Sequence, residues 1–274
     1  MIKRILARKT NQNRISKTSE IVSDGQPFAY REAYKAMRTN FNFATLDGKL
    51  KTILITSSIP GEGKSTFSIN LAISLIESGK KVLLIDADLR NPSIHRYLRI
   101  RQQQLQGLSN LLSTGNLPKD AIGHLERYNI DILLSGTIPP NPVELLSKSN
   151  FADIIKSVEN EYDYIIIDAP PVGVVTDAAV LSKFADGVIM VVGQGLAKQQ
   201  QIDKAKTSLE NVKANVIGAV LNNYDASIDN KNANIESYYY YGGEWYVKSV
   251  ESLSTSYRWW CLLFNKVINY LFIK

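Results

Sequence analysis

The sequence predicts an α/β protein built on a doubly wound, mostly parallel sheet, with an N-terminal helix and a flexible, tyrosine-rich C-terminal tail. Short runs of consecutive apolar residues alternate along the chain with longer segments of helical periodicity. Strands that are apolar throughout indicate a sheet covered by helices on both faces. Aspartates also stand where several of these runs end, which is the edge at which such sheets bind ligands.

The elements are expected in a regular order. A helix covers 28–43, where apolar side chains recur at helical spacing. The strand KTILITS at 51–57 follows, and then a helix at 65–79 that ends on Gly79, a residue suited to a helix C-cap. Further along, the expected elements are strands at 81–88 and 131–136, a helix or helix pair at 141–160, a strand at 162–171, a helix at 177–185, a strand at 186–193, a helix at 198–212 and a strand at 215–223.

Composition divides the chain into four segments. Residues 1–27 are basic and flexible, 28–224 form the α/β domain, 225–246 hold a polar linker and clustered tyrosines, and 247–274 are basic and amphipathic. The single cysteine excludes an intramolecular disulfide framework, and the two histidines exclude a His-rich metal cluster. The N-terminus lacks the apolar region of a signal peptide, and no apolar run reaches the roughly 20 residues of a membrane span. We therefore expect a cytoplasmic protein.

The formal net charge of +6 is concentrated at the chain ends. Residues 1–19 contain basic side chains and no acidic one, and residues 248–274 are also basic, so the segment between them is mildly acidic. Basic ends suit an anionic partner such as a lipid surface, whereas a solvated, disordered tail explains the N-terminal charge equally well. Nucleic acid is not expected as a partner, because only Phe28 and Tyr30 lie near this end and they make no stacking platform.

A glycine-rich loop, SSIPGEGKST, joins the first apolar strand to the next helix. Such a loop can point several backbone N–H groups at a phosphate, and the helix N-terminus adds its dipole. Lys64 can reach the β- and γ-phosphates, and Ser65 can bind Mg²⁺. The match to G-x-x-x-x-G-K-[ST] is incomplete because Ser58 stands at the first glycine, and a plain turn is the alternative. The residues expected to bind the nucleotide are Pro60, Gly61, Glu62, Gly63, Lys64, Ser65 and Thr66.

Three aspartates, Asp86, Asp88 and Asp168, stand at the ends of the strands LLIDAD and YIIID. Carboxylates in such positions destabilise the fold unless a cation faces them. Mg²⁺ bound to a nucleotide is the natural cation, and capping of the next helix or loop is the alternative role. Nearby, Arg90 could face phosphate or pair with an acid. At the end of the last strand, Asn222 could hydrogen-bond adenine or cap the following turn.

Tyrosine is common, at 14 residues, and several tyrosines are packed together after the polar linker. Four consecutive tyrosines fit no amphipathic pattern, because they would expose rings on every side. An adhesive strand or a surface that stacks on a partner is one explanation. The clustered residues are Tyr238, Tyr239, Tyr240, Tyr241 and Tyr246.

Together, SSIPGEGKST, LLIDADLRNP, YIIIDAPP, the upstream REAYKAMRTN and the tyrosine-rich tail resemble the bacterial tyrosine kinases (BY-kinases). The similarity is to the cytoplasmic, capsule- or exopolysaccharide-associated type of Gram-positive bacteria, and it covers residues 28–246. It implies a P-loop NTPase fold like that of MinD and ParA. It also implies an ATP- and Mg²⁺-dependent protein-tyrosine kinase that regulates polysaccharide synthesis and export.

The resemblance implies a role for each matching residue. Lys64 would bind the ATP phosphates, together with Ser65 and Thr66. Either Asp86 or Asp88, with Asp86 favoured, would help to deprotonate the incoming tyrosine. The metal ligands would be Ser65, Asp88 and Asp168, and the catalytic set would be Lys64, Asp86, Asp88 and Asp168. The clustered tyrosines would be the acceptors, phosphorylated by a neighbouring subunit.

The resemblance also implies partners: a homo-oligomeric ring, a separate membrane activator that recruits the kinase to the inner face of the cell membrane, and a cognate tyrosine phosphatase. The family's ring-forming helix usually reads Glu-x-x-Arg-x-x-Arg, whereas this chain has Glu32, Lys35 and Arg38. Lysine lacks the planar fork of arginine, so the contact should be weaker. An i,i+3 surface pair is the alternative role for these residues.

The C-terminal SYRWWCLLFNKVINYLFIK continues past the point where the family's tails commonly stop. Its apolar residues fall on one helical face, so it could lie in a membrane interface or dock on the domain or the activator.

The main rival function is a membrane-cycling ATPase of the MinD/ParA type. That class carries a lysine where this chain has Ile59, and it needs no tyrosine cluster. A binding module that uses the nucleotide only as a switch is disfavoured by the intact Lys64 and the three aspartates.

Overall fold

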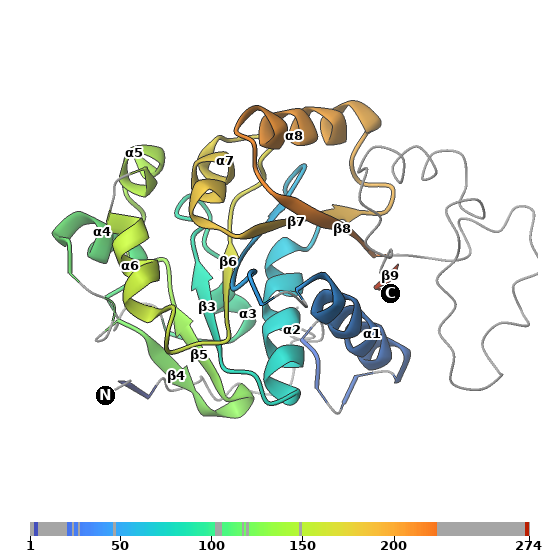
Figure 1. Ribbon diagram of the computed structural model, residues 1–274, viewed down its shortest axis with the longest axis horizontal. Helices are drawn as coiled ribbons and strands as arrows, with labels where there is room; N and C mark the ends of the chain where they lie inside the picture. The colour runs from blue at the N-terminus through green and yellow to red at the C-terminus, as the bar shows by residue number, and fades with distance from the viewer. Residues whose placement is uncertain are drawn as a thin grey trace, which may run out of the picture.

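The computed structural model describes residues 3–4, 21–23, 25–26, 28–45, 48–101, 106–116, 118, 121–147, 150–223 and 272–273 (Figure 1). The tyrosine cluster, the polar linker and most of the basic segments at the two ends lie outside the described residues. No helix among the described residues is both long enough and apolar enough to cross a bilayer.

One sheet runs through the whole fold, in the order β1-β4-β5-β3-β6-β2-β7-β8-β9. All neighbouring strands are parallel except β4 and β5, which are antiparallel. The strands are β1 (Lys3–Arg4), β2 (Thr52–Ser57), β3 (Val82–Asp86), β4 (Gly123–Leu125), β5 (Ile130–Leu133), β6 (Tyr164–Asp168), β7 (Gly187–Gly193), β8 (Val216–Asn222) and β9 (Phe272–Ile273).

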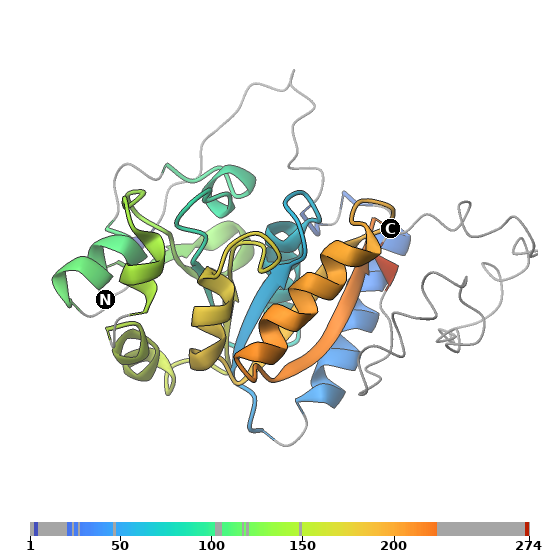
Figure 2. The same cartoon turned by 90° about the horizontal axis from the view of Figure 1, so that it is seen from above.

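Helices cover both faces of the sheet (Figures 1 and 2). They are α1 (Phe28–Ala44), α2 (Lys64–Glu77), α3 (Ile94–Tyr97), α4 (Leu108–Thr114), α5 (Pro142–Leu146), α6 (Asn150–Val158), α7 (Asp177–Leu181) and α8 (Gln199–Asn211), with 3₁₀ turns η4 (Glu126–Tyr128) and η5 (Ser182–Phe184). The predicted helix or helix pair at 141–160 is the pair α5 and α6.

Two apolar cores form because successive strand residues point to opposite faces. Ile53 and Ile55 of β2 pack with α1, α2 and α3 on one face, while Leu54 packs with α4 to α8 on the other. Every residue of β2 is buried, as expected for a strand that is apolar throughout. The predicted doubly wound α/β class is therefore confirmed.

The register of the central strands sets the position of the functional residues. Asp86 at the end of β3 pairs with Asp168 at the end of β6, and Ile55 of β2 also pairs with Asp168. The carboxyl ends of three strands thus meet at one edge, beside the loop that leaves β2. Six short elements go beyond the sequence prediction, because segments of two to seven residues carry little periodicity: β1, β4, β9, α3, α4 and η4.

Candidate active site

The glycine-rich loop turns sharply between β2 and α2. Gly61 and Gly63 have φ angles of 89° and 84°, in the left-handed region that favours glycine. A Cβ atom at Gly63 would overlap the side-chain amide of Asn222, so glycine is required there for space as well as for conformation. The loop therefore depends on a contact with the last long strand of the sheet.

Glu62 holds this loop from the inside. Its carboxylate is fully buried and accepts hydrogen bonds from the backbone N–H groups of Ser58 (2.7 Å), Ile59 (2.9 Å) and Gly193 (3.1 Å). It also accepts one from the Ser58 hydroxyl at 2.8 Å. The side chain of Glu62, predicted among the nucleotide-binding residues, therefore faces the protein and ties the loop to the end of β7.

Asn222 acts on the same loop. Its amide nitrogen donates to the main-chain oxygen of Glu62 at 2.9 Å, across 160 positions of sequence. This bond is neither of the two roles considered for Asn222, which were contact with adenine and capping of a turn. The side chain of Asn222 instead connects β8 to the phosphate loop.

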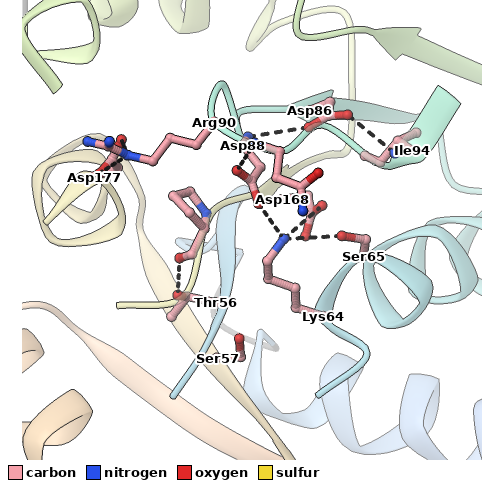
Figure 3. A network of polar contacts seen from close by, with 12 residues as sticks. Thr56, Ser57, Lys64, Ser65, Asp86, Asp88, Arg90, Ile94, Asp168 and Asp177 are labelled. Atoms are coloured by element: carbon pink, nitrogen blue, oxygen red, sulfur yellow. Dashed lines mark hydrogen bonds and ion pairs between the residues drawn. The ribbon is translucent and has the colours of Figure 1, made fainter. Parts of the chain in front are cut away.

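Lys64 lies among carboxylates (Figure 3). Its ammonium is 2.9 Å from Asp88 Oδ2 and 3.7 Å from Asp168 Oδ2, and it donates to the Ser65 hydroxyl at 3.2 Å. Burial by itself lowers the pKa of Lys64, but the negative charges of Asp168 and Asp88 outweigh it, so the pKa lies above its ordinary value. Lys64 is therefore a fixed positive charge at the start of α2.

Asp86 and Asp168 are completely buried. Burial, followed by the charge of Asp168, raises the pKa of Asp86 to about 8. Asp86 accepts two long hydrogen bonds, both 3.3 Å, from the backbone N–H groups of Asp88 and Ile94. Burial also raises the pKa of Asp168, although Lys64 opposes it. The carboxyl end of the sheet thus gathers three carboxyl groups around one lysine.

One oxygen of Asp168 is suited to a metal ion. Oδ1 accepts from the Ser68 hydroxyl at 3.2 Å, whereas Oδ2 is buried with no hydrogen-bond partner among the described residues. Within those residues, no group of three His, Cys, Asp or Glu side chains is arranged to hold a metal by itself. This fits Mg²⁺, which is commonly held by one or two carboxylates together with substrate phosphates and water.

Arg90 pairs with an acid. Its Nε donates to both oxygens of the buried Asp177, at 3.0 and 3.1 Å. This contact decides between the two roles considered for Arg90, and it joins the loop after β3 to the first residue of α7. Neither Asp177 nor Ser68 was identified from the sequence as a site residue, because the partners are 87 and 100 positions away.

The predicted ring contacts on α1 have partners within the chain. Glu32 and Lys35 form an i,i+3 ion pair at 2.6 Å. Arg38 donates to the main-chain oxygen of Ser74 on α2 at 2.7 Å, and its guanidinium lies 4.0 Å from Glu77. Arg38 therefore stabilises the packing of α1 on α2, while the ammonium of Lys35 remains on an exposed side chain.

The site can bind a polyphosphate and place acids around its terminal group. Backbone N–H groups at the start of α2 and the Lys64 ammonium supply positive charge. On the other side, the carboxyl groups of Asp86, Asp88 and Asp168 are of the chemical type that can accept a proton or bind a cation. These parts suit the transfer or hydrolysis of a phosphoryl group.

Comparison with known proteins distinguishes these reactions. Residues 50–222 match the family model described as an AAA domain. The chain is 40% identical over 191 residues to tyrosine-protein kinase YwqD of Bacillus subtilis (strain 168), which covers 70% of this chain and 80% of the relative. Among solved structures, the chimerical protein CapA2B2 matches with a TM-score of 0.70 and 36% identity, over 76% of this chain and 91% of that one.

A more distant structure shows the fold alone. The MinC:MinD cell division complex of Aquifex aeolicus matches with a TM-score of 0.55 at 22% identity, over 65% of this chain and 70% of that chain. Relatives that are 36–40% identical to this chain are named as tyrosine-protein kinases, one of them as putative, so the comparisons favour the kinase over the MinD-type ATPase.

Proposed function

This chain belongs to the bacterial tyrosine-protein kinases, and on that premise we propose that it transfers the γ-phosphoryl group of ATP to tyrosines in its own C-terminal segment, between subunits. The observation that carries the proposal is the position of Lys64. Its ammonium lies between a glycine-rich loop at a helix N-terminus and three carboxylates at the ends of β3 and β6.

The reaction needs positioning and charge neutralisation more than covalent chemistry. The loop N–H groups and Lys64 hold the β- and γ-phosphates. The tyrosine oxygen attacks the γ-phosphorus, and the bond to the bridging oxygen of ADP breaks as the new O–P bond forms. Asp86 takes the phenolic proton, because it is a buried carboxylate at the carboxyl end of β3, opposite Asp168 in the sheet.

Mg²⁺ would be held by Ser65, Asp88 and Asp168, and when bound it would neutralise charge on the phosphates. Asp168 Oδ2, which is buried and accepts no hydrogen bond from the described residues, supports this assignment. Glu62 and Asn222 contribute by keeping the loop in shape for the phosphates.

The acceptors are Tyr238, Tyr239, Tyr240, Tyr241 and Tyr246, which lie outside the described residues. They begin 14 residues after Tyr224, and a flexible chain of that length spans about 20 Å on average. The last residue of β8 is Asn222, beside the phosphate loop, so the segment starts close to the site. Delivery to a neighbouring subunit fits this reach, with Lys35 available on the exposed side of α1 for a ring contact.

We further propose the setting of the reaction: a cytoplasmic kinase recruited to the membrane by the cytoplasmic tail of a separate activator, reversed by a phosphatase, and controlling capsular or exopolysaccharide synthesis. The resemblance in motifs and the similarity to the CapA2B2 chimera support this setting.

The decisive experiment is incubation of the full chain with Mg-ATP and a candidate activator tail, followed by mass-spectrometric mapping of phosphotyrosine. Lys64→Met tests the site, and Lys81→Met, an exposed lysine ahead of β3, is the matched control. We expect phosphotyrosine at 238–246 in the parent and the control and none in Lys64→Met. ATP consumption without phosphotyrosine would contradict the kinase proposal and favour a MinD/ParA-type ATPase.

A further inference from the structure

The end of the chain pairs with the carboxyl end of β8, on the outer edge of that strand. Phe272–Ile273 form β9, which runs parallel to β8, with Leu221 opposite Phe272 and Asn222 opposite Ile273. Figure 2 shows β9 (red) beside α1 (blue), and the two elements are in contact. The pairing therefore lies at the carboxyl end of β8, the end nearest the phosphate loop.

A groove between α1 and β8 adjoins this edge. It is mostly apolar, and among the described residues that line it Asn40 has the one polar side chain. Residues of α1 and of β8 that line it include Met37, Asn40, Phe41, Ala44, Ile217 and Val220. A strand edge next to an apolar groove is a site at which a further strand can pair, and proteins usually cover such edges.

The last residues of the chain have the composition that such a site requires. The stretch LLFNKVINYLFI at 262–273 is rich in leucine, isoleucine, valine and aromatic residues. Residues of these types favour strands and can bury their side chains against the groove. The 48 residues from 224 to 271 are more than enough chain to return from Asn223 to the same corner.

We propose that the C-terminal segment of this chain docks on its own domain, adding a strand to β8 and placing its apolar residues at the groove between α1 and β8. Residues 224–271, which include all five clustered tyrosines, then begin and end at one corner of the domain. That corner holds Asn222, the residue that braces the phosphate loop. The docking does not depend on the proposed kinase activity.

Hydrogen–deuterium exchange of the full chain tests the pairing directly. Phe272→Pro/Ile273→Pro removes two backbone donors and prevents a strand, whereas the matched control Phe272→Val/Ile273→Val retains strand propensity. We expect amides near Leu221 and Asn222 to exchange roughly tenfold faster in the proline variant and at the parent rate in the control. Amides of β3 and β6 report whether the fold is unchanged. Equal protection of β8 in the parent and the proline variant would overturn the proposal.

A second pair of variants tests the groove. Asn40→Lys places a charge among the apolar lining residues, and Thr39→Lys places the same charge on an exposed neighbouring position. We expect faster exchange at the end of β8 only in Asn40→Lys. Hydrogen–deuterium exchange of the parent protein, repeated over a hundredfold dilution of the protein, shows whether the strand paired with β8 comes from the same chain or from a second copy. Constant protection supports docking within one chain, while protection that falls on dilution would assign the strand to a second copy and overturn the proposal.

Discussion

Both ends of the parallel sheet carry aspartates, but the aspartates at the two ends differ in their burial and in their hydrogen-bond partners. At the amino end, Asp186 accepts from the N–H groups of Lys51 and Thr52, both at 2.8 Å, and Asp163 accepts from that of Lys81 at 2.8 Å. At the carboxyl end, Asp86 and Asp168 are buried together and burial raises the pKa of both. Acids with partners stabilise the fold, whereas acids without enough partners mark the end that awaits a cationic ligand.

A third aspartate at the amino end of the sheet strengthens the comparison. Asp131 of β5 also lies toward the amino end, where it bonds the His124 ring at 2.7 Å and accepts from the Tyr162 hydroxyl at 3.0 Å. Both of its oxygens are used. Its position in a partly buried network therefore has a structural explanation that needs no ligand.

The largest effect is expected at the carboxyl end. Asp168→Asn should reduce tyrosine phosphorylation by about 10³-fold, because it removes a charged ligand beside the reacting phosphate. It should also raise the Tm of the nucleotide-free protein, since the charge of Asp168 raises the pKa of Asp86 more than that of Asp88 does. Phosphotyrosine assays and thermal unfolding at one pH measure the two effects.

Asp186→Ala is the counterpart at the amino end. It should lower the unfolding free energy by about 1–2 kcal/mol, because two backbone N–H groups lose a charged acceptor. Phosphorylation by the folded protein should stay at the parent level. If Asp168→Asn were destabilising and Asp186→Ala inactive, the contrast between the two ends would be wrong.

An intermediate effect is expected for Glu62, which lies at the carboxyl end of the sheet but whose carboxylate accepts several hydrogen bonds. Glu62→Gln should cost about 2 kcal/mol of stability, because an amide NH₂ cannot accept from the backbone N–H groups that the carboxylate holds. A looser loop should also raise the KM for ATP by roughly tenfold. Glu77→Gln, on a half-exposed side chain of α2, is the control. An unchanged KM with lower stability would restrict Glu62 to a folding role.

The smallest effect is expected at the Asp131 network. Tyr162→Phe should cost about 1 kcal/mol at pH 8, because it removes one hydrogen bond and leaves an oxygen of Asp131 without its donor. Activity should be unaffected. Urea unfolding gives the change in stability.

The same variant predicts a pH dependence. Burial, and then the charge of Asp131, raises the pKa of Tyr162 above its ordinary value. An unfolded tyrosine loses its proton near pH 10 while the folded one keeps it, so this stability is present below about pH 10 and falls as the pH rises further. Tyr162→Phe should therefore lose less stability than the parent between pH 8 and pH 10.5. Parallel losses would contradict the role of the phenol.

Much of the fold and part of the site follow from the sequence because their signals are local. The apolar runs at 52–57 and 164–168 predict buried strands, and residues 58–63 form a glycine-rich loop between strand and helix. Since parallel strands align their carboxyl ends at one edge, Asp86 and Asp168 could be expected to meet. The sequence by itself therefore determined the class of the sheet and the charged core of the site.

Only the tertiary structure decided how that core is supported. The Glu62 carboxylate turns inward to β7, Asn222 bonds the loop from β8, and Arg90 pairs with Asp177 on α7. Each contact joins residues 87 to 160 positions apart. Which strand lies beside which is a property of the assembled sheet, and a side chain's partner depends on that neighbour. Residue type and spacing predict a charge at a strand end, but packing determines what the charge faces.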